Sequence, residues 1–242
     1  MEILYLTFLT IIAGGIGTLT GFGTSTIMVP VLLVFFPLAP TLLLVGVLHV
    51  FGDIWKISLF RQGVRWRLIL LFGVPGVIST FLGARLVFSV PETLLSKILG
   101  GFLIAYVAFL AFNPDFKFKQ NTLTATTGGA VSGFFAGIFG VGGAIRGAFL
   151  AAFDLPKAVY IATAGAIGLA IDTVRIGTYL SEGTTLPSHL YWGLLLFIPA
   201  SFIGAHAAKK IVDRIPQEQF RLVVAIFLLL FGVKLLIFPS YN

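Results

Sequence analysis

The stretch GFGT at residues 21–24 has a counterpart later in the chain, GVGG at residues 140–143, and the surroundings of the two are similar. An aspartate lies the same distance beyond each stretch, inside an otherwise apolar run. Asp53 is 53 − 21 = 32 positions beyond the first glycine of its stretch, and Asp172 is 172 − 140 = 32 positions beyond the other. In both halves a base follows the aspartate three residues later. The sequence therefore predicts an internally duplicated chain.

The composition places the whole chain in a lipid bilayer. Only 10% of its 242 residues are charged, 58% are hydrophobic and the mean hydropathy is +1.05, whereas about a quarter of the residues in a soluble domain are charged. A membrane-spanning helix needs roughly 20 apolar residues, so the chain has room for about ten crossings and for no separate soluble domain. It contains no cysteine, which excludes disulfides, thiolate metal sites and cysteine nucleophiles.

Ten apolar runs, bounded by glycine, proline or charge, are predicted to be helices. The runs 24–37 and 143–154 directly follow the glycine stretches and are short for a crossing, so each is either a full span or a re-entrant half-helix. The predicted fold class is therefore an all-α integral membrane protein with 8–10 transmembrane or re-entrant helices. The ten runs are about 3–20, 24–37, 40–60, 67–88, 93–112, 122–139, 143–154, 156–180, 189–208 and 218–238.

Positive charge gathers in three predicted loops, whereas the loop at 181–185 has no base. The positive-inside rule makes the three loops cytoplasmic, and ten crossings place all of them on one side. Because each half has an odd number of segments, five, the second half is inverted in the membrane relative to the first. Inverted repeats of this kind place a solute site near the membrane midplane, where the two repeats meet. We therefore expect inverted repeats at 1–112 and 122–242, joined by a linker at 113–121, in a multi-pass protein of the cell membrane. The loop bases are Arg61, Arg65, Arg67, Lys117, Lys119, Lys209, Lys210 and Arg214.

The two glycine stretches are candidate anion-binding breaks between helices. Glycine allows a helix to break, and a helix that starts at the break directs unpaired N–H groups and the positive end of its dipole at whatever lies there. The alternative is that these glycines only let neighbouring helices approach closely. The residues predicted to contact an anion are Gly21, Gly23, Thr24, Gly140, Gly142 and Gly143.

Arg146 lies three residues beyond the second glycine stretch, in a run that is otherwise free of charge. A buried guanidinium needs a partner, which is either a permanent carboxylate or the transported oxyanion, to which it offers a bidentate pair of donors. The corresponding position in the first half is Ile27. We therefore expect the halves to bind substrate unequally, with Arg146 as the main anchor.

Asp53 and Asp172 each share a helix face with the base three residues on, Lys56 and Arg175. His49 lies four residues before Asp53 and adds a group that titrates near neutral pH to the same face. These five residues are predicted to couple or gate transport, with protons as the coupling ion. The alternatives are self-neutralised pairs, carboxylates that satisfy a helix break in the other half, and a histidine that only hydrogen-bonds. We expect no metal and no cofactor.

A wider set of residues carries a family resemblance. It consists of the first glycine stretch, RQGVRW at residues 61–66, Pro75 followed by GAR at 83–85, and the repetition of this plan in the second half. With these features the chain resembles the TauE/SafE-type sulfite exporter family over nearly its whole length. The resemblance implies a secondary carrier that exports sulfur-containing anions, such as sulfite or sulfonates. The chain departs from the family in having GFGT rather than a glycine-richer run, and in having Phe149 as the counterpart of Pro30.

Two other functions are open to a membrane protein with these residues. An anion channel could be lined by the same glycine breaks, and saturable counterflow in liposomes separates a carrier from it. An intramembrane aspartyl protease needs two carboxylates that share one proton, but a base one turn from each aspartate favours ionisation of both. We therefore expect a transporter rather than an enzyme. Its expected partners are a small anionic solute, the lipid bilayer and protons, without nucleic acid, and the sequence does not determine the oligomeric state.

Overall fold

The computed structural model describes residues 1–20, 23–113, 118–211 and 217–239. Over these residues the chain forms ten α-helices, one short 3-10 helix and no strand, which confirms the all-α fold class. Each of the ten predicted runs corresponds to a helix. The helices are α1 (Glu2–Thr20), α2 (Ser25–Leu32), α3 (Leu38–Leu59), α4 (Trp66–Leu86), α5 (Glu92–Phe112), α6 (Thr122–Phe139), α7 (Gly142–Leu150), α8 (Lys157–Ser181), α9 (Ser188–Ile211) and α10 (Gln217–Ile237), and the 3-10 helix η1 is Ala151–Phe153.

The lengths of the helices separate spans from shorter segments. Within the described ranges, six helices are long and apolar enough to cross a membrane, namely α1, α3, α4, α5, α8 and α9. In contrast, α2 has 8 residues and α7 has 9. At 1.5 Å per residue they are about 12–14 Å long, which is less than half of the roughly 30 Å hydrocarbon layer. Their lengths therefore favour half-helices over full spans.

Local sequence signals explain where several helices begin. A proline stands immediately before α3, α5 and α8, at Pro37, Pro91 and Pro156, and its fixed φ and missing N–H suit the start of a helix. Asn121 precedes α6, and its side-chain oxygen accepts a 2.7 Å hydrogen bond from the Thr124 amide, as an N-cap residue does.

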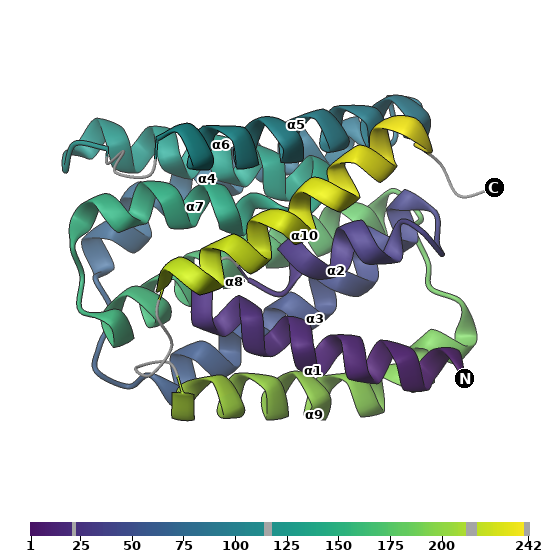
Figure 1. Cartoon of the computed structure of the whole chain (residues 1–242), viewed down its shortest axis with the longest axis horizontal. Coiled ribbons are helices and arrows are strands. Elements are labelled where there is room, and N and C mark those ends of the chain that lie inside the picture. The colour runs from purple at the N-terminus through teal and green to yellow at the C-terminus, as the bar shows by residue number, and fades with distance from the viewer. Residues whose placement is uncertain (21–22, 114–117, 212–216, 240–242) are drawn as a thin grey trace.

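The helices α3 and α8 lie side by side in the middle of the molecule, and the others are arranged around them (Figure 1). On one side α1 packs along α9, and on the other α4 packs along α6. The half-helices α2 and α7 contact each other, and they also contact α3 and α8, respectively. Because α3 carries Asp53 and α8 carries Asp172, the fold brings the charged residues of both halves to the centre.

Glycines on one face of α6 let this helix approach α4 closely. Gly129, Gly133 and Gly137 are spaced by four residues and therefore lie on the same side of the helix. A Cβ atom added at Gly133 would come within 2.6 Å of the Gly76 Cα on α4. In addition, Thr80 Oγ1 donates a 2.7 Å hydrogen bond to the Gly133 carbonyl. The α4–α6 contact thus depends on small residues and on a hydrogen bond between helices, as is common in membranes.

Gly133→Ala is expected to lower the thermal stability of the protein in detergent, because the added methyl group must push α6 away from α4. Overpacking of this kind costs about 1–3 kcal/mol. The matched control is Gly73→Ala on α4, where an added Cβ atom would meet no atom of another helix within 4 Å. Thermal unfolding followed by circular dichroism measures the difference, and equal midpoints for the two variants would contradict the tight contact.

Candidate anion site

Each predicted aspartate is paired with the base that follows it on the same helix. On α3, Lys56 Nζ lies 2.7 Å from Asp53 Oδ1, and on α8, Arg175 Nη2 lies 2.8 Å from Asp172 Oδ1. All four side chains are buried. A buried charge is costly unless it is paired, and the three-residue spacing supplies the partner.

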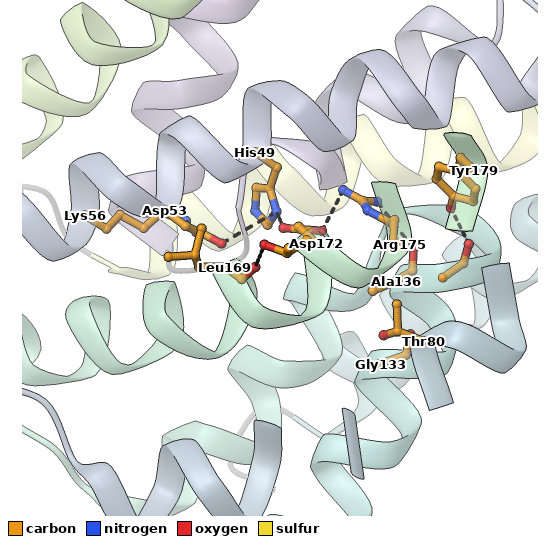
Figure 2. A network of polar contacts seen from close by, with 12 residues as sticks. His49, Asp53, Lys56, Thr80, Gly133, Ala136, Leu169, Asp172, Arg175 and Tyr179 are labelled. Atoms are coloured by element: carbon orange, nitrogen blue, oxygen red, sulfur yellow. Dashed lines mark hydrogen bonds and ion pairs between the residues drawn. The ribbon is translucent and has the colours of Figure 1, made fainter. Parts of the chain in front are cut away.

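His49 connects the two halves (Figure 2). Its Nδ1 is hydrogen-bonded to Asp172 Oδ2 on α8 and lies 3.8 Å from Asp53 Oδ2 on its own helix. Because an ionised carboxylate can only accept, Nδ1 is the donor. The sequence placed His49 on the face of Asp53, but its hydrogen-bond partner belongs to the other half. The imidazole therefore lies between two carboxylates, each of which also has a base of its own.

Gly23 brings the start of α2 against the opposite edge of the His49 ring. Its φ of +84° favours glycine, and a Cβ atom at this position would collide with His49 Nε2. The Gly23 amide donates to the Gly17 carbonyl at 3.3 Å, so this amide already has a partner. Thr24 is buried just before α2, and Gly21 lies outside the described residues. Gly23 thus makes room for His49.

The second glycine stretch forms the turn between α6 and α7. Gly140 ends α6 with a φ of +71°, and its amide donates to the Ala136 carbonyl at 2.9 Å. A Cβ atom at Gly140 would come within 2.9 Å of Arg175 Nη1, and one at Gly142 within 2.6 Å of the Ala136 Cβ. Gly143 is buried in the first turn of α7. The close approach of α6, α7 and α8 therefore explains why positions 140 and 142 are glycines.

Arg146, on α7, is a buried base without a carboxylate partner. Its side chain is only 1% exposed, yet within the described part of the chain its Nε and Nη2 have no hydrogen-bond partner and no carboxylate forms an ion pair with it. A buried charged group with unused donors is unfavourable unless something else binds it. Of the two predicted partners, the permanent carboxylate is not found among the described residues.

Arg146 reaches the centre of the site because position 168 on α8 is a glycine. A Cβ atom at Gly168 would lie 2.8 Å from Arg146 Nη2 and 3.0 Å from Asp53 Cγ. Sequence reasoning missed Gly168, although a signal was present. Gly168 precedes Asp172 by 172 − 168 = 4 residues, as His49 precedes Asp53 by 53 − 49 = 4 residues. The second half thus has a glycine, Gly168, at the position that corresponds to His49 in the first half. The Arg146 guanidinium lies beside this glycine.

The six ionisable side chains at the centre carry an excess of positive charge. Lys56, Arg146 and Arg175 contribute +3 and the two aspartates contribute −2, so the sum is 3 − 2 = +1 with a neutral His49 and +2 with a protonated one. In a low-dielectric interior an unbalanced charge strongly favours a counterion. The charge of the cluster therefore favours a small anion over a cation, and Arg146 Nε and Nη2 are donors that have no partner among the described residues.

The same cluster contains a set of atoms of the types that bind metals. One ring nitrogen of His49 and one oxygen each from Asp53 and Asp172 lie within 4.8 Å of one another. However, one oxygen of each carboxylate is already bound to Lys56 or Arg175, and a metal cation would add to the positive excess. The residues present therefore fit an anion better than a metal ion. The expectation of no metal stays a prediction.

Comparison with known proteins gives one family. A family model described as Sulfite exporter TauE/SafE matches residues 6–235 of the 242, so the match contains every residue of the central site. A search of curated proteins gives no match.

Proposed function

Because the chain belongs to the TauE/SafE sulfite exporter family, we propose that it exports a small sulfur oxyanion, such as sulfite or a sulfonate, across the cell membrane. The family implies a multi-pass membrane transporter of sulfur-containing anions. The proposal adds that transport is secondary and proceeds by alternating access, with the anion bound between α3, α7 and α8.

The buried guanidinium of Arg146 is the observation that carries this proposal. Its Nε and Nη2 form one edge of the group, and neither has a hydrogen-bond partner within the described ranges. Two adjacent donors on one edge match two oxygens of an oxyanion, which is the bidentate geometry that arginine favours. The substrate would then supply the partner and the counter-charge that the protein lacks.

Helix contacts support inverted repeats at 1–112 and 122–242, with 113–121 between them, and alternating access would use such repeats. In the two repeats α1 corresponds to α6, α2 to α7, α3 to α8 and α4 to α9. Corresponding pairs of helices are in contact: α1 packs on α9 as α6 packs on α4, and α2 contacts α3 as α7 contacts α8. The helices α3 and α8 would exchange with each other and are in contact. An anion beside them would lie where two inverted halves meet, as solutes do in carriers of this kind.

Proton coupling through His49 is the second part of the proposal. The charged groups around its ring are Asp53 and Lys56 on its own helix, Asp172 and Arg175 on α8, and Arg146 on α7. Protonation of His49 raises the charge of the cluster from +1 to +2, by the sum given above. A second positive charge strengthens binding of an anion, so proton and anion would be carried together.

Asp53→Asn is expected to flatten the pH dependence of transport while anion binding is retained. The change removes a carboxylate 3.8 Å from His49 Nδ1, so the protonated imidazole loses one of the two negative charges that stabilise it. The measurement is the initial rate of sulfite efflux from proteoliposomes between about pH 5 and 8, where histidine titrates. An unaltered pH profile would count against His49 as the coupling group.

Two further variants separate lost coupling from lost folding. Asp53→Asn leaves Lys56 buried without its partner, whereas Asp53→Asn/Lys56→Met creates no additional unpaired charge and is expected to recover stability. Asp154→Asn is the matched control, because Asp154 is exposed outside the central site and its φ of 45° is one that asparagine tolerates.

Counterflow tests the proposed function itself. Liposomes that contain the purified protein and unlabelled sulfite or sulfonate should transiently accumulate labelled substrate, at a rate that saturates with concentration. Large unitary currents would instead identify an anion channel. Absence of counterflow for every sulfur anion would contradict the proposal.

An intramembrane aspartyl protease fits the central site less well. Such an enzyme needs two carboxylates that share one proton. Here Lys56 contacts Asp53, Arg175 contacts Asp172, and His49 lies between the two carboxylates. Each carboxylate thus has a base of its own as its partner and is not arranged to share one proton with the other carboxylate, so the transporter is the function that we propose.

A further inference from the structure

A cavity of about 510 Å³ lies outside the central site, where α3 ends, α8 begins and α9 ends. It is lined by three bases, Arg61, Lys157 and Lys209, and by Gln62, Phe60 and Ala158. None of the described residues that line it is acidic. A hollow that carries one sign of charge focuses the electric field and concentrates ions of the opposite sign.

The positive-inside rule accounts for bases on this side of the membrane but not for their arrangement. Lys210 on α9 and Arg67 on α4 are exposed bases that satisfy the rule without lining the cavity. Arg61 and Lys209 are 209 − 61 = 148 positions apart in the sequence, yet they meet around one hollow. Their convergence indicates a surface that attracts anions.

One apolar layer separates this cavity from the central site. Phe60 forms a buried cluster with Ile161 and Ala162. Phe60 lies 60 − 56 = 4 residues beyond Lys56, which is about one helical turn of 5.4 Å. One turn beyond Ile161, a Cβ atom at Gly165 would lie 3.2 Å from the Lys56 Cβ. The path from the cavity to the central site is therefore closed by a layer of side chains about one helical turn thick.

The barrier on the opposite side of the central site is thicker. Toward the start of α3, Leu44 and Leu38 are buried, and toward the end of α8 so is Tyr179. All three belong to one extended apolar cluster, and the Tyr179 hydroxyl donates to the Gly137 carbonyl on α6. The central site is thus closed on both sides, with the thinner barrier facing the basic cavity.

We infer that the basic cavity is the cytoplasmic vestibule of the carrier, where the oxyanion binds before it passes the layer of Phe60, Ile161 and Ala162. This inference rests on the proposed function and adds an outer binding site, the side from which the anion arrives and the barrier that it crosses. Arg61 and Lys209 are exposed, so the vestibule binds a hydrated anion loosely. Arg146 would bind it tightly once the layer has moved.

Charge-selective labelling tests the vestibule without relying on transport. The chain has no cysteine, so Ala158→Cys provides a single thiol in the lining of the cavity. A negatively charged methanethiosulfonate reagent is expected to react about 10-fold faster than a positively charged one. Arg61→Gln/Lys209→Gln should reduce this preference strongly, because it removes two of the three bases in the lining, whereas the matched pair Arg67→Gln/Lys210→Gln should preserve it. Equal labelling rates for the two reagents would overturn the inference, and so would an equal loss of the charge preference in the two double variants.

Transport kinetics test whether the vestibule lies on the anion's path. For sulfite applied from the cytoplasmic side, KM is expected to rise about 3- to 10-fold in Arg61→Gln/Lys209→Gln with kcat unchanged, and to stay constant in Arg67→Gln/Lys210→Gln. Equal KM values in the two pairs would overturn the inference. A difference in KM between the two pairs that is seen only with acidic lipid in the vesicles would also overturn it, because the cavity would then bind a lipid headgroup.

The same measurements distinguish failure of the vestibule from failure of the carrier. If the unmodified protein shows no saturable flux of any sulfur anion, the proposed function fails and the vestibule fails with it. If the unmodified protein transports but its cavity shows no charge preference, the vestibule alone is wrong.

Discussion

Arg146→Gln is expected to abolish transport of sulfur anions without unfolding the protein. In the proposed site, each hydrogen bond from the guanidinium to the anion contributes about 1.5–3 kcal/mol, so the loss of two weakens binding by a factor of about 10² or more. The substitution also removes a buried charge that has no described partner. The substrate-free variant should therefore be at least as thermally stable as the unmodified protein, while stabilisation by anions disappears.

Thermal shift and flux together measure this result. Sulfite, thiosulfate, sulfonates and carboxylates are added to purified protein, and the anion that stabilises it most is then used in proteoliposomes. Arg146→Lys keeps the charge but loses the planar pair of donors, so it should retain only weak binding. The control is Arg85→Gln, because Arg85 is exposed and pairs at 3.3 Å with Glu182 far from the centre. Unchanged uptake by Arg146→Gln would exclude Arg146 as the anion anchor.

Gly168→Ala is expected to cause the second-largest loss of transport, although it adds only a methyl group. The new Cβ atom would lie 2.8 Å from Arg146 Nη2 and 3.0 Å from Asp53 Cγ, so both side chains must move. A displacement of about 1 Å in a positioned group can reduce a rate by about 10²-fold. The flux should fall by about that factor, with weaker anion stabilisation in the thermal-shift assay.

Gly177→Ala is the matched control for this substitution. It lies on the same helix α8, and an added Cβ atom would have no neighbour within 4 Å. Alanine favours a helix over glycine by about 1 kcal/mol, so this variant should transport normally and unfold at an equal or higher temperature. If Gly168→Ala transports as well as Gly177→Ala, the space at position 168 is not part of the anion site.

The fold could be predicted from the sequence because the bilayer imposes a simple rule. Apolar runs of sufficient length become helices, and the boundaries differ by only a few residues, as in α3 (Leu38–Leu59) against the predicted 40–60. The pairs Asp53–Lys56 and Asp172–Arg175 were also predictable, because side chains three residues apart on a helix are neighbours.

The remaining parts of the site depend on contacts between distant segments, which helical spacing does not encode. The partner of His49 is Asp172, 172 − 49 = 123 positions away. The neighbour of Arg146 is the backbone of Gly168 on another helix. The Gly140 amide donates to the Ala136 carbonyl, and a Cβ atom at Gly140 or Gly142 would meet neighbouring side chains, contacts that only the folded chain reveals; that these glycines contact an anion stays a prediction.

The two intrahelical ion pairs have an electrical consequence for the proposed carrier. Lys56 and Asp53 both belong to α3, and Arg175 and Asp172 both belong to α8, so each helix carries its own opposite charges when it moves. A neutral pair that moves as a unit transfers no net charge across the membrane potential, whereas each unbalanced charge contributes about 2.3 kcal/mol per 100 mV. Within the central cluster, and with His49 neutral, the charge left to respond to the voltage in the empty carrier is then that of Arg146, and a bound monovalent anion cancels it.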